Sequence, residues 1–308
     1  MSDTRNNTLS SPYLLLALAP LFWGGNAVVG KLAITEWNAI EFTFLRWVFA
    51  VALIGFMARA HLKKDWPAIR ENWWKLALMG GFGFVGFNLC LYGALHYTSA
   101  INVSIEQAAI PVVIMLLNRV LFSQQVFGLQ VLGVVIATIG VIITVTQGNP
   151  AMLLNEGLNR GDAIMIIAIV FYSAYSVSLR WRPEIHDLSF IFSLAVVSLT
   201  VLLPLIAWNA QSRGLPEINA DNVLLIIYVA IFPSFLAQLF YAKGVARIGA
   251  NRGGIFINLV PIFGALLAVL VLGEEFKIYH LVGLTLVLAG IGLAEWIVRQ
   301  HNKKQGAG

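Results

Sequence analysis

The chain has 308 residues, of which 59% are hydrophobic and 11% are charged, and its mean hydropathy is +0.80. A soluble domain carries roughly 25% charged residues, so this composition excludes an ordinary soluble protein and indicates an integral membrane protein. The net charge of +5 could suggest a nucleic-acid partner, but the basic residues are distributed as membrane orientation requires, and we expect no nucleic acid.

The apolar residues fall into segments of the length that crosses a bilayer, about 20 residues. The first segment follows a polar stretch and is too long for a signal-peptide core, so we expect it to remain as a span. The connections are short and leave no room for a soluble domain. We therefore predict an all-α integral membrane protein with ten transmembrane helices, at residues 13–33, 39–58, 74–95, 102–122, 127–147, 161–181, 188–208, 222–242, 253–273 and 279–298.

The sequence repeats loosely at a spacing of 150 residues, because residues 100–140 return as residues 250–290. Five spans per half is an odd number, so the second half must enter the membrane from the opposite side. Two inverted repeats around a central cavity are typical of secondary transporters. We expect a first five-helix repeat over residues 1–150 and a second over residues 151–308. The most informative matches are Pro111 with Pro261, Gly133 with Gly283, and Gly140 with Gly290.

Two glycine patterns imitate nucleotide-binding motifs. Residues 25–31 spell most of a P-loop, but Leu32 replaces the Ser or Thr that holds magnesium, and residues 81–86 spell GxGxxG inside a span. We interpret both as close-packing or flexible helix positions and expect no ATP site and no cofactor. The histidines are scattered and no residues have metal-ligand spacing, so we expect no metal site and no catalytic residues. An intramembrane enzyme is the alternative class.

Ionisable groups at membrane depth are functional candidates. Arg46 lies seven residues into the second span and Glu106 four residues into the fourth, both counted from the outer end. Lys31 and Glu41 flank them nearer the outer surface. Two hypotheses stay open: Arg46 and Glu106 line a cavity and meet a zwitterionic solute, or they form a permanent ion pair between helices.

Polar and aromatic side chains share helix faces within several spans. Phe84, Asn88 and Tyr92 recur every four residues in the third span and so lie on one face. An amide facing lipid has no partner, so this face is expected to line the cavity. Later spans contribute Tyr175, Gln238 and Asn258 to the predicted substrate site.

The matched prolines and glycines have different predicted roles. Pro111 and Pro261 each free a backbone carbonyl and kink the helix, so we predict that they act as gates or hinges. The paired glycines of the fifth and tenth spans are seven residues apart. They are predicted to make close-packed support helices that do not form cavity wall.

The distribution of basic residues predicts the orientation. With the N-terminus inside, thirteen Lys and Arg residues fall in inner segments and three in outer loops, so both termini are expected in the cytoplasm. The inner residues are Arg5, Arg59, Lys63, Lys64, Arg70, Arg180, Arg182, Lys243, Arg247, Arg252, Arg299, Lys303 and Lys304, and the outer ones are Arg160, Arg213 and Lys277.

Four motifs resemble those of drug/metabolite transporters of the EamA type, and the chain is most similar to the YddG amino-acid exporters among them. The resemblance implies ten helices around a cavity formed by spans one to four and six to nine. It adds Trp23 and Asn26 to the predicted cavity. The motifs are Phe22-Trp23-Gly24-Gly25-Asn26, Phe44-Leu45-Arg46, Gly161-Asp162 and Leu272-Gly273-Glu274 after Pro261.

Three substrate classes remain open. Amino acids need one partner for each charge and an apolar wall, which Arg46, Glu106 and the aromatic face could supply. Lipophilic cations would use Glu106 with an aromatic cage. Phosphorylated sugars would need several basic residues and are the least supported. We expect a transporter, with no enzymatic activity and no obligate protein partner, that exports aromatic and other neutral amino acids across the bacterial inner membrane by alternating access.

Overall fold

The computed structural model describes residues 11–123, 128–149, 151, 158–248 and 254–305, and these residues form helices and connecting turns without a strand. The all-helical prediction is confirmed. By length and composition, seven helical segments of the described chain are long and apolar enough to cross a membrane. Three shorter apolar helices accompany them, at Val131–Val145, Phe256–Leu272 and Ile278–Ala294.

The first half contains short irregular helical turns between its α-helices. The predicted start of the fifth span, residue 127, lies outside the described residues. The elements are α1 (Pro12–Ala33), α2 (Ala39–Glu71), α3 (Trp73–Met79), the π-helical turn η2 (Gly80–Gly86), α4 (Phe87–Leu95), α5 (Ala100–Glu106), the 3-10 turn η3 (Gln107–Ala109), α6 (Ile110–Phe122) and α7 (Gly128–Val145).

The second half has a similar series of elements. The predicted start of the ninth span, residue 253, is also outside the described residues. The elements are α9 (Arg160–Ser178), η4 (Leu179–Trp181), α10 (Asp187–Arg213), α11 (Val223–Ile231), the π-helical turn η5 (Phe232–Leu236), α12 (Ala237–Ile248), the 3-10 turn η6 (Gly254–Leu259), α14 (Val260–Leu272) and α15 (Ile278–Gln305).

Helix α2 is longer than the predicted span 39–58, because it continues to Glu71. Its start is fixed by a capping box, in which Asn38 accepts from the backbone of the first turn and Glu41 accepts from the backbone N–H of Asn38. The residues after 58 are mostly polar or charged helix formers, so they leave the apolar region without ending the helix.

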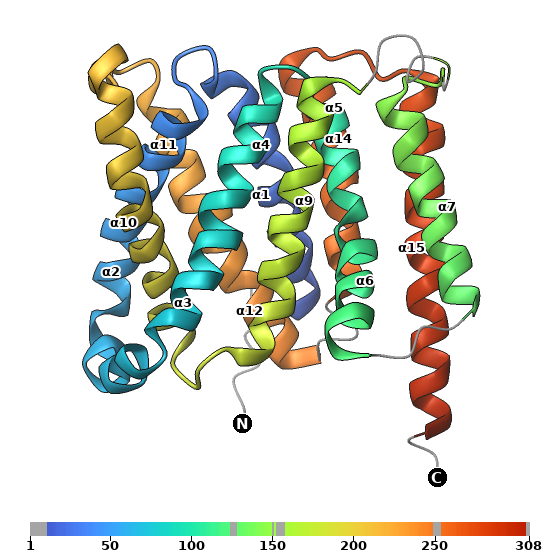
Figure 1. Cartoon of the computed structure of the whole chain (residues 1–308), viewed down its shortest axis with the longest axis horizontal. Helices are drawn as coiled ribbons and strands as arrows, with labels where there is room; N and C mark the ends of the chain where they lie inside the picture. The colour runs from blue at the N-terminus through green and yellow to red at the C-terminus, as the bar shows by residue number, and fades with distance from the viewer. Residues whose placement is uncertain (1–10, 124–127, 150, 152–157, 249–253, 306–308) are drawn as a thin grey trace, which may run out of the picture.

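The irregular turns recur at the repeat spacing. The π-helical turns η2 and η5 end at Gly86 and Leu236, 150 residues apart, and the 3-10 turns η3 and η6 each precede a helix with Pro at its start. The helices that follow, α6 and α14, end at left-handed residues, Ser123 with φ 52° and Gly273 with φ 67°. The repeat therefore preserves backbone irregularities as well as residues. In Figure 1, α1 runs from the lower to the upper edge, whereas α9 runs from the upper to the lower edge.

Helices α7 and α15 lie side by side at one edge of the molecule (Figure 1). A Cβ atom built on Gly140 would lie 2.6 Å from the carbonyl oxygen of Gly283, and one on Gly133 would lie 2.5 Å from that of Gly290. Only glycine allows the two backbones to approach this closely. The prediction of close-packed support helices is confirmed, and neither helix contributes to the cavity described below.

The two nucleotide-motif imitations also lie in helices. Gly25 and Gly30 both lie within α1, where Gly25 packs against Tyr228 and Gly30 packs against Tyr92. The glycines of residues 81–86 fall in η2, where Gly83 packs against the ring of Tyr175. Neither stretch follows a strand or forms a loop, so neither has the context that phosphate binding requires.

Candidate functional site

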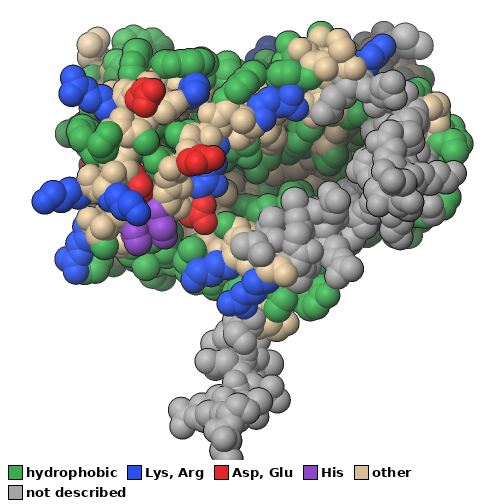
Figure 2. Space-filling model, turned by 90° about the horizontal axis from the view of Figure 1, so that it is seen from below, with side chains coloured by type: hydrophobic (Ala, Val, Ile, Leu, Met, Phe, Trp, Pro, Cys, Tyr) green, Lys and Arg blue, Asp and Glu red, His purple; other side chains and the backbone are tan. Residues whose placement is uncertain are grey.

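A cavity of about 360 Å³ lies between the two halves, a size that suits a small-molecule site. We call the lower edge of Figure 1, where α1 begins and α9 ends, the open end, and the opposite edge, where α1 ends at Ala33 and α5 begins at Ala100, the closed end. The open-end face is hollowed and carries many Lys and Arg side chains, as Figure 2 shows. The cavity lining extends to Leu179, at the open end of α9.

The cavity wall comes from spans one to four, six, eight and nine. The expectation for the seventh span is wrong, because α10 contributes no lining residue and packs instead against the outer side of α2 and η2. Eight of the ten predicted substrate-site residues line the cavity, and so do both predicted hinge prolines. They are Trp23, Asn26, Arg46, Phe84, Asn88, Tyr175, Gln238 and Asn258, with Pro111 and Pro261.

Arg46 is the charged residue of the lining and is held by neutral side chains. Its Nε donates to the hydroxyl of Ser234 at 2.7 Å, and its Nη1 donates to Asn26, Asn88 and Tyr92 at 3.1, 2.6 and 2.6 Å. Among the described residues, none accepts a hydrogen bond from its Nη2 and no carboxylate pairs with it. The side chain is only 5% exposed. A buried guanidinium is therefore fixed in direction with one nitrogen left for a ligand.

The partners of Arg46 are themselves fixed. Tyr92 donates to Asn26 at 2.8 Å, Asn88 donates to the carbonyl of Phe84 at 2.7 Å, and the Ser234 hydroxyl donates to the carbonyl of Val229 at 2.6 Å. Tyr92 does not line the cavity as predicted but lies behind Arg46, fully buried. It acts on the site through the guanidinium.

Glu106 does not meet Arg46, and it is not among the cavity-lining residues. Its side chain interacts with Asp162 of α9 and is 1% exposed. The two residues lie at similar depths, but the faces of α2 and α5 that carry them point to different neighbours. The hypotheses of a shared zwitterion and of a permanent Arg46–Glu106 ion pair are both corrected by this arrangement.

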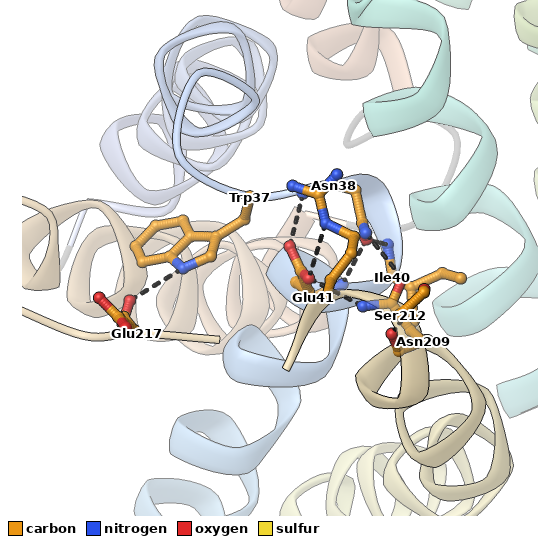
Figure 3. A network of polar contacts seen from close by, with 8 residues as sticks. Trp37, Asn38, Ile40, Glu41, Asn209, Ser212 and Glu217 are labelled. Atoms are coloured by element: carbon orange, nitrogen blue, oxygen red, sulfur yellow. Dashed lines mark hydrogen bonds and ion pairs between the residues drawn. The ribbon is translucent and has the colours of Figure 1, made fainter. Parts of the chain in front are cut away.

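Lys31 and Glu41 hold the closed end together. Lys31 donates to the carbonyl oxygens of Leu95 and Thr98 at 2.6 and 2.9 Å, which ties α1 to the turn between α4 and α5. Glu41 accepts from Asn209 at 2.8 Å, as Figure 3 shows, and lies 3.4 Å from Arg213 Nε. These charges join helix ends and do not face the cavity.

Several lining residues were not predicted from the sequence. Trp47 stacks on Phe84, with centroids 4.6 Å apart and planes 8° apart, and the Arg46 guanidinium lies 5.1 Å from its ring centroid. Ser234 follows Pro233, and a polar residue beside a proline in an apolar span could have indicated the π-helical turn. Gln107 lines the cavity just after Glu106, and no pattern in the sequence distinguished the two.

The lining combines one cation, several amides and many aromatic rings, and among the described residues it contains no carboxylate. Such a wall can bind a carboxylate at Arg46 and an apolar or aromatic body against the rings. The aromatic members are Trp23, Trp47, Phe84, Phe87, Tyr172, Tyr175 and Tyr241.

Comparisons with known proteins agree with a transporter. Residues 10–146 and 159–295 each match the EamA-like transporter family. The chain is 26% identical to the uncharacterized transporter YyaM of Bacillus subtilis (strain 168) over 95% of its length and 97% of that protein. It is 24% identical to an uncharacterized transporter of Archaeoglobus fulgidus, over 95% of this chain and 99% of the other. One crystal structure has the same fold, with a TM-score of 0.63, 16% identity and coverage of 95% of this chain and 98% of that one.

Proposed function

This chain belongs to the EamA-like transporter family, and on that premise we propose that it is a secondary transporter that exports amino acids, as the YddG-like resemblance implies. Aromatic amino acids and other neutral ones are the proposed substrates. The single observation that carries the proposal is the guanidinium of Arg46, which is buried at the cavity wall with neutral partners only.

Arg46 is the proposed site for the substrate carboxylate. A buried charge without a counter-ion is costly, so this arrangement favours a ligand that brings the missing negative charge. Arg is suited to the role because its Nη2, which has no acceptor among the described residues, can donate a charge-assisted hydrogen bond to a carboxylate while Nε and Nη1 stay bonded to the protein. The bonds to Ser234 and Asn88 fix the guanidinium plane before the ligand arrives.

The aromatic wall is the proposed site for the rest of the substrate. Rings of Trp23, Tyr172 and Tyr175 line the cavity, and an ammonium group can lie over such rings. The amides of Gln107 and Asn258 offer acceptors for it. This composition weighs against lipophilic cations, because Arg46 would repel them and no described lining residue is a carboxylate. It also weighs against phosphorylated sugars, because they need more than one basic group.

Alternating access between two inverted five-helix repeats is the proposed mechanism. The seven candidate spans and three shorter apolar helices together give the proposed ten crossings, and the opposite directions of α1 and α9 in Figure 1 support inversion. We place the open end and both termini in the bacterial cytoplasm, so that the cavity is loaded from inside. A C-terminal reporter that is active only in the periplasm would refute this orientation.

The decisive experiment is transport into proteoliposomes with matched ligands. Radiolabelled phenylalanine should be transported, and unlabelled 3-phenylpropionate, which lacks the amino group, should compete with it. Phenylethylamine, which lacks the carboxylate, should not compete. Competition by phenylethylamine but not by 3-phenylpropionate would replace amino-acid export with transport of lipophilic cations.

A further inference from the structure

Two carboxylic side chains are buried together between α5 and α9, on the closed-end side of the cavity. Glu106 and Asp162 are each 1% exposed, and their carboxyl groups interact with each other. Neither belongs to the cavity lining. The pair therefore has no part in the substrate site proposed above.

The pair lacks hydrogen-bond donors. Both oxygens of Glu106 and Oδ1 of Asp162 have no partner, although the Thr98 side chain bonds to Asp162. Glu41, a carboxylate buried at the same end, has donors from Asn38, Asn209 and Arg213. Two facing acceptors without a donor between them are joined by a proton, since a protonated carboxyl donates to its neighbour.

No cation neutralises the pair within the described structure. Lys31 is held by two backbone carbonyls, and His280 contacts Asn102 at 3.2 Å. Glu274 accepts from the backbone at the start of α5. Helix α14 and the described side chains of α7 carry no titratable group. The titratable or charged groups on the elements packed against α5 at this end include Lys31, Cys90, Tyr92, Arg160, Glu274 and His280, and the side chain of Arg160 is exposed.

Two negative charges without a cation are not stable in this dry interface, because each buried ion loses its hydration and gains no opposite charge in return. One bound proton removes one charge and supplies the missing donor. We propose that Glu106 and Asp162 form a proton-binding site, which takes up one proton when the closed end shuts and releases it when that end opens.

The location of the pair couples the proton to the gate. Glu106 directly precedes the 3-10 turn η3, where Gln107 and Ala108 line the cavity. Asp162 follows Gly161, which packs against Thr98 and the carbonyl of Ala94 so closely that a Cβ would lie 2.8 Å from each. Separation of α5 from α9 at the closed end admits water, which hydrates both carboxylates and lets the proton leave. The proton thus stabilises the state in which the closed end is shut.

The first test detects the proton by infrared spectroscopy of the full-length protein in lipid at neutral pH, without substrate. The wild type should show a carboxylic-acid C=O band that disappears in Glu106→Gln and in Asp162→Asn. Glu41→Gln is the matched control, because its carboxylate has donors, and the band should persist in it. Absence of the band in the wild type, or its persistence in both pair variants, overturns the proposal.

The second test follows the gate. A single cysteine at Ala33, buried at the closed end, is labelled with a membrane-impermeant maleimide in a Cys90→Ala background. The reaction rate of any cysteine with the maleimide rises with pH, because the thiolate is the reactive form. Each rate is therefore divided by that of a cysteine in an unfolded peptide at the same pH. The corrected rate should rise by up to about tenfold per pH unit, the limit for one linked proton. Glu106→Gln, whose amide donates to Asp162 permanently, should be flat. If the corrected rate rises with pH as steeply in Glu106→Gln as in the wild type, the proposal is overturned. A rate that changes with sodium concentration at fixed pH also overturns it, because that result would indicate a metal-cation site.

Discussion

Replacing Arg46 with lysine should weaken amino-acid binding while the protein stays folded. Lysine keeps the positive charge but cannot reproduce the planar fork. Its single nitrogen cannot bond to Ser234 and Asn88 and also donate to a ligand, as the separate nitrogens of the guanidinium can, so at least one charge-assisted bond to the substrate carboxylate is lost. Such a bond contributes about 1.5–3 kcal/mol, which corresponds to roughly 10- to 150-fold in the dissociation constant at 1.36 kcal/mol per factor of ten.

The assay is binding of phenylalanine in detergent by isothermal titration calorimetry, followed by uptake into proteoliposomes. Arg59→Lys is the matched control, since it makes the same change on the same helix beyond the cavity, where the guanidinium lies 4.3 Å from the ring centroid of Phe56. Monodisperse elution of both variants shows that they are folded. If Arg46→Lys binds phenylalanine as tightly as Arg59→Lys does, Arg46 does not bind the carboxylate.

Three further predictions concern the scaffold. Pro111→Ala and Pro261→Ala should bias the labelling of a single cysteine on the cavity wall in opposite directions, and identical labelling of both variants and the wild type would mean that the prolines only shape static packing. Gly290→Val should separate α7 from α15 and lower the melting temperature, whereas Gly292→Val should not, because a Cβ there meets nothing within 4 Å. Glu41→Gln should destabilise the protein by about 1.5–3 kcal/mol through its weakened bonds at the closed end, measured as a lower midpoint of thermal unfolding.

The sequence predicted the fold well because the bilayer imposes a strong signal. Segments of about 20 apolar residues have few alternatives to a spanning helix, and matched Pro and Gly residues revealed the repeat. The end of α2 was not predictable from hydropathy, since the helix continues to Glu71 through residues that leave the apolar region. The absence of α10 from the lining was also not predictable from the sequence, because the number of polar or aromatic residues in a helix does not show which side of the helix meets the cavity.

The site was predicted in part for a related reason. Counting residues along a span gives depth, and Arg46, chosen by its depth, lies at the cavity wall. It does not give the rotation of one helix relative to another, so Glu106 was assigned to Arg46 although its side chain meets Asp162. Tyr92 shares a face with Asn88 but lies one turn nearer the closed end, and this turn places it behind the guanidinium.

The paired π-helical turns make a change of register available within the membrane. A π turn contains one residue more than an α turn, and one residue corresponds to about 100° of helix rotation. If the π turn shifts along the helix, the residues between its old and new positions rotate about the helix axis, and the segment stays helical. In η5 such a step carries the Ser234 hydroxyl away from Arg46 Nε, whose 2.7 Å bond depends on it. The orientation of the buried charge at the cavity wall is thus coupled to the winding of a helix in the opposite half.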